Sequence, residues 1–102
     1  AERMGLDRRT VFDVVQASSG ASFVFATRMG RVVEGDATVH AAAHILTKDV
    51  GLACAAAREA ESPSPLADVA AEIFRATVAM GLGNRDDGAV IDWFRAGGPA
   101  PR

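Results

Sequence analysis

The sequence has 102 residues, of which 49% are hydrophobic and 24% are charged, and its formal net charge is −2. This length allows one domain, and this charge gives no reason to expect binding to nucleic acid or to an anionic membrane surface. A single cysteine excludes an internal disulfide and fits a cytoplasmic location, and no apolar run reaches the roughly 18 residues of a membrane span.

The first five residues have the pattern of a helix end, which Gly5 would close. Asp7 then suits the N-cap of a helix of about ten residues, because its carboxylate can accept hydrogen bonds from the first helical N–H groups. The chain has no initiator methionine and opens within a helical pattern. We therefore expect it to be a fragment of a longer protein.

A loop over residues 18–20, rich in serine and glycine, separates this helix from a second one, predicted over about 23–33. Ser22 suits the N-cap of the second helix, and Gly35 suits its end. Phe23 is large and apolar, and it is therefore expected in the core.

The stretch over residues 39–61 predicts a long central helix that is rich in alanine. Its apolar side chains cover more than half of the helix circumference, and a helix of this kind is normally surrounded by other helices. Lys48 shares a polar strip with His44 one turn earlier. Asp49 falls within the apolar arc, where a carboxylate is costly unless it is paired or hydrogen-bonded.

The Ser-Pro-Ser-Pro sequence at residues 62–65 predicts a firm break after the central helix. A further helix is predicted over 66–82, where apolar residues recur at steps of three and four. Residues 86–87, both aspartate, suit the start of a last short helix. Because no segment alternates with a period of two, the predicted fold class is all-α, with about five helices around a central buried helix.

Three residues invite other chemical interpretations. His40 and His44 are four apart on the predicted helix, a spacing that can place two imidazoles on one metal ion. No clear third ligand lies nearby, so no metal is expected and the metal site remains a weaker hypothesis. Cys54 lies on the apolar side of the helix and is expected to be an inert, small, buried residue.

Two interpretations of Lys48 and Asp49 stay open on the residues alone. In the structural one, the lysine extends to solvent and the aspartate bonds to a neighbouring helix. In the functional one, Lys48 reaches a ligand's hydroxyl or phosphate oxygens, and Asp49 fixes the helix. Gly51 would then allow the ligand to approach closely.

Several motifs occur in one order: GLD near the start, then SSGAS, HILTKDVGLA, SPSPL and GLGNRDDGAVI. In this order they resemble the C-terminal helical domain of the β-hydroxyacid dehydrogenases, the family of 3-hydroxyisobutyrate dehydrogenase. The resemblance runs from about Ala1 to Phe94 and is strongest for the L-threonate dehydrogenase branch. The fold it implies resembles the C-terminal domain of 6-phosphogluconate dehydrogenase.

The resemblance implies a division of labour between two domains. Residues 1–96 would be the helical domain, which closes over the nicotinamide and mediates dimerisation, and residues 97–102 would be a flexible tail. A separate N-terminal Rossmann domain, not contained in this sequence, would bind NAD or NADP. The family's catalytic lysine would also lie upstream, so this segment holds no catalytic residue and is expected to be inactive alone.

The resemblance also implies roles for residues on the central helix. Lys48 matches the family lysine that contacts the cofactor near the nicotinamide ribose, and Asp49 matches the acid that helps to shape the site. His44 would replace an acid that is often found on the same strip. Ala41 stands where many members have a phenylalanine, which suggests a roomier or more polar substrate pocket.

In the N-terminal part, the resemblance places Ser19, Gly20 and Ser22 in a loop that faces the cleft between domains. Phe23 stands where the family often has tryptophan. The expected partners are a small hydroxy-acid substrate and a second copy of the chain, without nucleic acid or membrane. The alternative function is a non-catalytic helical module for dimerisation or binding.

Overall fold

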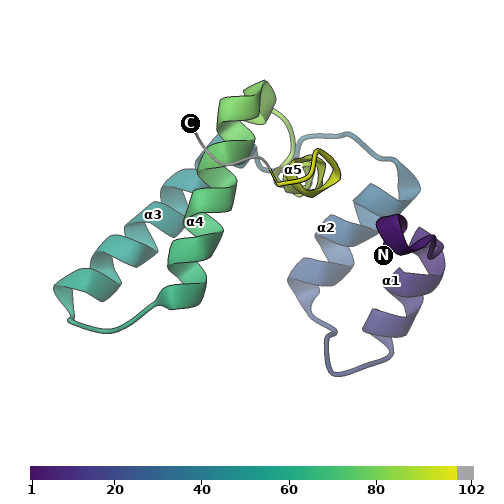
Figure 1. Cartoon of the computed structure of the whole chain (residues 1–102), viewed down its shortest axis with the longest axis horizontal. Helices are drawn as coiled ribbons and strands as arrows, with labels where there is room; N and C mark the ends of the chain where they lie inside the picture. Colours follow the sequence, from purple (N-terminus) through teal and green to yellow (C-terminus); the bar gives the residue numbers. More distant parts are fainter. Residues whose placement is uncertain (99–102) are drawn as a thin grey trace. The chain divides into compact units, whose positions relative to one another are not determined.

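The computed structural model describes residues 1–98, and all of its regular structure is helical (Figure 1). Five α-helices are joined by short 3₁₀ and π segments, and the described residues contain no β-strand, only an isolated bridge between Ala42 and Asp86. The predicted all-α class is therefore confirmed. The chain divides into two compact units, Ala1–Ala37 and Thr38–Arg102.

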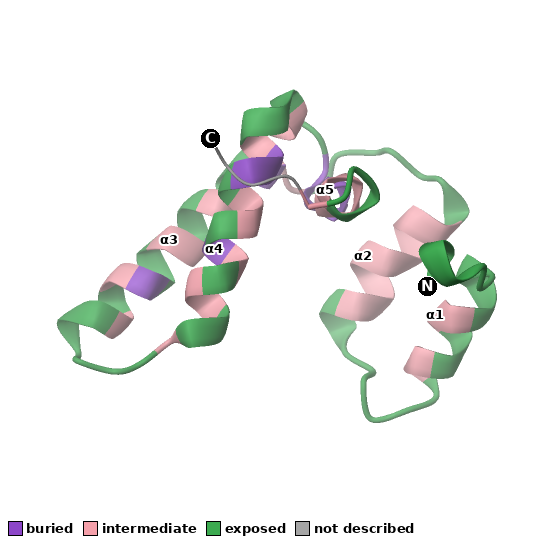
Figure 2. Ribbon diagram, in the orientation of Figure 1, coloured by how far each residue is buried: buried purple, intermediate pink, exposed green. Residues whose placement is uncertain are grey.

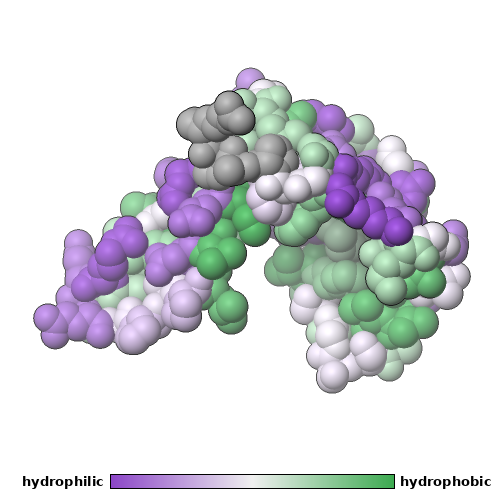
Figure 3. All heavy atoms as spheres, in the orientation of Figure 1, coloured by the Kyte–Doolittle hydropathy of each residue, from purple (hydrophilic) through white to green (hydrophobic). Residues whose placement is uncertain are grey.

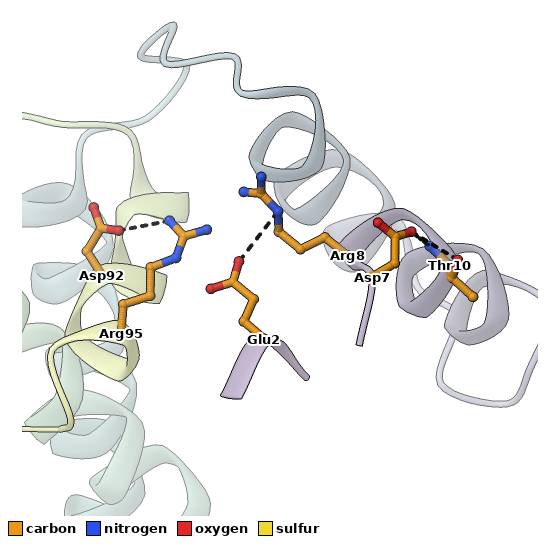
Figure 4. A network of polar contacts seen from close by, with 6 residues as sticks. All are labelled: Glu2, Asp7, Arg8, Thr10, Asp92 and Arg95. Atoms are coloured by element: carbon orange, nitrogen blue, oxygen red, sulfur yellow. Dashed lines mark hydrogen bonds and ion pairs between the residues drawn. The ribbon is translucent and has the colours of Figure 1, made fainter. Parts of the chain in front are cut away.

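The first unit contains the 3₁₀ turn η1 (Glu2–Met4) and the helices α1 (Arg8–Gln16) and α2 (Phe23–Glu34). Gly5 ends η1 at φ 73°, a left-handed conformation that glycine adopts at low cost. Asp7 caps α1, because its carboxylate accepts from the N–H of Thr10 at 2.8 Å and from the Thr10 hydroxyl at 2.9 Å (Figure 4).

The helix α2 begins and ends where its capping residues predict. The Ser22 hydroxyl oxygen accepts from the N–H of Phe25 at 2.9 Å, and Gly35 closes the helix at φ 71°. Phe25 stacks on Phe12 of α1, with ring centroids 5.4 Å apart. The two helices therefore meet through an aromatic pair.

Within the described range 2–34, no residue of η1, α1 or α2 is buried (Figure 2). Phe23 is 78% exposed, so its expected place in the core is wrong. A pair of helices has only one interface, and Phe12 and Phe25 occupy it. Phe23, as the first residue of α2, points elsewhere.

The second unit is built on two helices that lie side by side, α3 (Ala43–Glu59) and α4 (Pro65–Thr77) (Figure 1). The predicted break between them is confirmed, and Pro65 occupies the first turn of α4, where a missing N–H costs nothing. The chain continues through the π segment η2 (Val78–Leu82), the 3₁₀ turn η3 (Asp87–Ala89) and α5 (Val90–Arg95).

The central helix differs from its prediction in two ways. It begins at Ala43 rather than at residue 39, because His40 and Ala41 bond to Asp86 and Asp87 instead of continuing the helix. Within residues 43–59, only Ala43 and Cys54 are buried, so the expected surrounding by other helices is wrong. The helix packs on α4 along one face, and its other apolar residues are exposed or half-buried.

The helix predicted over 66–82 ends as an α-helix at Thr77 and continues as a π turn, in which Gly81 has φ 84°. Thr77 is fully buried, and its hydroxyl donates to the carbonyl of Ile73 at 2.9 Å. At the C-terminal end, Gly98 donates to the carbonyl of Trp93 at 2.9 Å. The remainder of the predicted flexible tail, residues 99–102, lies outside the described residues.

Candidate functional site

The exposed strip of α3 carries the predicted cofactor-binding residue. The Lys48 ammonium lies 3.0 Å from Oδ1 of Asp49, and the two side chains are 65% and 54% exposed. Asp49 is therefore not in an apolar interior, contrary to its predicted position. An exposed ion pair contributes about 0–1 kcal/mol to the free energy of unfolding. A bound anion can therefore replace Asp49 as the partner of Lys48 at little cost.

The surface around Lys48 is open. Apart from the adjoining helix backbone, no heavy atom lies within 4 Å of the position that a Cβ on Gly51 would take, so packing within the unit does not require this glycine. His44, one turn before Lys48, is exposed. A ligand can therefore approach the strip formed by His44, Lys48 and Gly51 without displacing other residues.

His40 and His44 do not form the predicted helical pair. His40 precedes α3, and its N–H is bound to the carboxylate of Asp86 at 2.8 Å. Across residues 1–98, no group of three or more histidine, cysteine, aspartate or glutamate residues is placed to hold a metal ion. The metal hypothesis depended on two histidines one turn apart on a helix, and the structure does not have this arrangement.

The serine loop in the first unit is held by local hydrogen bonds. The Ser18 hydroxyl donates to the carbonyl of Val15 at 2.8 Å and accepts from the N–H of Gly20 at 3.3 Å. A Cβ on Gly20 would lie 3.2 Å from Cγ1 of Val15, so glycine suits this turn. These bonds fix the shape of the loop without a ligand, and Ser19 within the loop is exposed.

The predicted site residues fall into two sets, one in each unit. His44, Lys48 and Asp49 lie on α3, and Lys48 and Asp49 are in contact. The other set comprises Ser19, Gly20, Ser22 and Phe23, at the start of α2. All residues of both sets are exposed, as residues that meet a ligand or another domain have to be.

Cys54 is only 2% exposed, which agrees with its predicted burial. Burial raises the pKa of its thiol above the ordinary value, and the neighbouring Asp68 raises the pKa further. A thiol in this state is a poor nucleophile, because the thiolate is the reactive form.

Sequence reasoning missed the importance of Asp86, which it treated only as the start of the last helix. Asp86 is 8% exposed, and Oδ2 accepts from the N–H of Gly88 at 3.3 Å, as a local cap does. Its other oxygen binds the segment before α3. The only sign of this role in the sequence is that two aspartates stand at the start of the last helix, where one is enough to cap it.

Residues 1–94 match the family described as the NAD-binding domain of NADP-dependent 3-hydroxyisobutyrate dehydrogenase, and the chain belongs to this family. The predicted resemblance is therefore confirmed. The family consists of NAD(P)-dependent dehydrogenases, in agreement with the predicted oxidoreductase class and cofactor.

Individual relatives agree with this assignment. The chain is 40% identical over 94 residues to L-threonate dehydrogenase of Escherichia coli K12. The aligned residues cover 92% of the chain and 31% of that relative. It is 36% identical over 90 residues to 2-(hydroxymethyl)glutarate dehydrogenase of Eubacterium barkeri, covering 87% of the chain and 30% of the relative. The chain thus spans less than a third of the length of these curated relatives.

A solved structure confirms the fold. The crystal structure of a 3-hydroxyisobutyrate dehydrogenase from Salmonella typhimurium matches with a TM-score of 0.86 at 39% sequence identity. The match covers 90% of the chain and 32% of that structure. None of the helices within residues 1–98 is long and apolar enough to cross a membrane.

Proposed function

We propose that the chain is the helical domain of an NAD(P)-dependent dehydrogenase that oxidises a small hydroxy acid of the L-threonate or 3-hydroxyisobutyrate type. The observation that carries the proposal is an exposed lysine, Lys48, on the open strip of α3 in a chain of this family. When bound, NAD(P) would supply the hydride-accepting chemistry of the reaction.

The residues of the chain fit one part of a dinucleotide. The Lys48 ammonium can donate to ribose hydroxyl or phosphate oxygens, and Asp49, 3.0 Å away, holds the ammonium when no ligand is near. The sequence contains no GxGxxG turn, the motif that cradles a pyrophosphate. Lys48 would therefore hold the cofactor in position for hydride transfer, while another domain binds most of it.

The exposed set in the first unit offers polar and apolar groups to a substrate. Ser19 and Ser22 carry hydroxyls that can donate to a carboxylate or hydroxyl of a small acid, and Phe23 provides an apolar wall. We propose that this loop faces the substrate. No residue of the segment is assigned a catalytic role, since the proton-accepting lysine of this family would lie elsewhere.

A hybrid dehydrogenase tests the proposal. These 102 residues replace the matching third of the Escherichia coli L-threonate dehydrogenase, and oxidation of L-threonate and 3-hydroxyisobutyrate is followed by NADH or NADPH absorbance. We expect activity with at least one acid, and no activity in the enzyme from which the matching third has been deleted. A folded hybrid that binds NADH no better than the truncated enzyme would contradict the proposal.

A matched pair of variants tests the role of Lys48 in the hybrid. Lys48→Ala is expected to raise the KM for the dinucleotide by about ten- to a hundredfold, because a charged hydrogen-bond donor to the cofactor is lost. Arg58→Ala is the control, because Arg58 is also an exposed cation on α3 with a carboxylate partner, Asp68, at 3.4 Å. Equal effects of the two variants on this KM would show that Lys48 has no specific role in binding the dinucleotide.

We also propose that the helical domain pairs with a second copy in the cytoplasm. Strongly hydrophobic side chains lie at the surface over α4 (Figure 3), where Leu66 is 87% exposed and Val69 is also exposed. Such a surface favours association. The same surface favours the alternative function, a non-catalytic dimerisation module, so analytical ultracentrifugation of the chain and its Leu66→Glu variant should accompany the activity test.

A dimer that Leu66→Glu dissociates would support the pairing, and a wild-type monomer at high micromolar concentration would contradict it. Association without any effect of Lys48→Ala on the dinucleotide KM would favour the alternative, non-catalytic function.

A further inference from the structure

The start of α3 has no cap of its own. Ala42 occupies the N-cap position, and no side chain there accepts a hydrogen bond. The first N–H groups of a helix have no intrahelical partner and need one from elsewhere. Here the partners are backbone carbonyls from a distant loop: Arg85 for the N–H of Ala43 at 2.8 Å, and Gly83 for the N–H of His44 at 2.9 Å.

Asp86 extends this arrangement to the residues before the helix. Its Oδ1 accepts from the N–H of His40 at 2.8 Å and from the N–H of Ala41 at 3.4 Å. In return, the N–H of Asp87 donates to the carbonyl of Ala41 at 2.8 Å. Five hydrogen bonds thus join residues 40–44 to residues 83–87, and we call this set of bonds the α3 clasp.

Capping of the short C-terminal helices does not by itself explain Asp86. That role uses only Oδ2, which accepts from the N–H of Gly88. Oδ1 is directed at the segment that enters α3, and Asp86 as a whole is 8% exposed. A buried carboxylate bonded to backbone N–H groups is held in one orientation, because losing those bonds would leave a desolvated charge.

We infer that Asp86 is a positioning residue, which fixes where α3 begins and thereby the place of His44 and Lys48 on its exposed strip. The helix transmits the constraint, since His44 is bound to Gly83 through its own N–H and Lys48 follows one turn later. Gly83 also lies close to the helix, because a Cβ on it would be 3.6 Å from Cβ of His44. The part of this inference that concerns cofactor binding rests on the proposed function.

Amide hydrogen exchange of the 102-residue chain tests the clasp without any cofactor. In Asp86→Ala, exchange over residues 38–46 should rise at least tenfold, whereas exchange over residues 66–77 of α4 should change less than twofold. Asp86→Asn keeps one accepting oxygen and should give an intermediate increase. Asp68→Asn is the control, because Asp68 is a more exposed carboxylate with one ion pair, to Arg58.

Two outcomes of this experiment would overturn the inference. Unchanged exchange over 38–46 in Asp86→Ala would show that the carboxylate does not hold the segment. An equal rise throughout the second unit would show that Asp86 contributes general stability rather than position. Asp86→Asn separates these cases if Asp86→Ala fails to fold, because it preserves the shape of the side chain.

The hybrid dehydrogenase gives the second readout. Asp86→Asn should raise the KM for the dinucleotide severalfold with a smaller change in kcat, and it should add little to Lys48→Ala. Fully multiplicative effects of the two substitutions would overturn the link to Lys48. If Lys48→Ala alone leaves KM unchanged, the proposed cofactor contact fails, while hydrogen exchange still decides whether Asp86 positions α3.

Discussion

Oδ1 of Asp86 accepts a hydrogen bond from the N–H of His40 at 2.8 Å, although the two residues are 46 positions apart in the chain. This bond joins the segment that enters α3 to the loop that follows α4. Removing a buried acceptor leaves its donors unsatisfied, at a cost of about 1–3 kcal/mol. We expect Asp86→Ala to lower the free energy of unfolding by this amount in urea titrations followed by circular dichroism.

The control for this prediction is Asp68→Ala, which removes a carboxylate with an exposed ion-pair partner. Its effect should stay within about 0.5 kcal/mol. Equal losses of unfolding free energy in Asp86→Ala and Asp68→Ala would mean that the α3 clasp contributes no more to stability than an exposed ion pair does.

The Lys48–Asp49 pair should matter little for folding. Both side chains are more than half exposed, so Lys48→Ala and Asp49→Ala should each change the free energy of unfolding by less than about 1 kcal/mol. Urea titration of each variant measures this directly. A larger loss would show a structural role, and any effect of these variants on cofactor binding would then need a different explanation.

The cap on α1 predicts a pH dependence. The hydrogen bond from the Thr10 N–H, and then the one from its hydroxyl, lowers the pKa of Asp7 below its ordinary value of 3.8. The ionised cap therefore stabilises the folded state above that value, and the contribution is lost as the pH falls through the lowered pKa. Circular dichroism from pH 6 to pH 2 should show a smaller acid-induced loss in Asp7→Asn than in the wild type.

The cap on α2 can be tested by substitution. Ser22→Ala should cost about 1 kcal/mol, because the N–H of Phe25 loses its acceptor, and Ser22→Asp should restore most of the loss. Hydrogen exchange over residues 23–34 localises the effect. Ser19→Ala, three residues earlier in the same loop, provides the comparison and should leave exchange in α2 unchanged.

Cys54 should react slowly with thiol reagents. It is 2% exposed, and burial raises the pKa of its thiol, so little thiolate forms at neutral pH. We expect reaction with a disulfide reagent to be at least a hundredfold slower in the native chain than in urea. A fast native reaction would show that α3 and α4 separate readily at this position.

Local chemistry allowed much of the fold to be predicted from the sequence. Asp7, Ser22 and Gly35 act within three or four residues of their own positions, so they cap or end helices wherever the chain goes. Pro65 breaks a helix for the same reason, because its ring removes an N–H. These residues, the helical periodicity and the ordered motifs were sufficient for the all-α class and the family.

The tertiary structure alone decided where α3 begins and what it buries. Residues 39–42 continue the helical pattern of the sequence, yet His40 and Ala41 bond to Asp86 and Asp87, more than 40 residues away. Helical periodicity cannot register this competition. The apolar arc of α3 predicts burial only if enough helices surround it, and within residues 38–98 one main partner, α4, covers one face. The sequence thus determined the elements through short-range bonds, whereas the extent of burial of α3 and the role of Asp86 depend on contacts between distant segments.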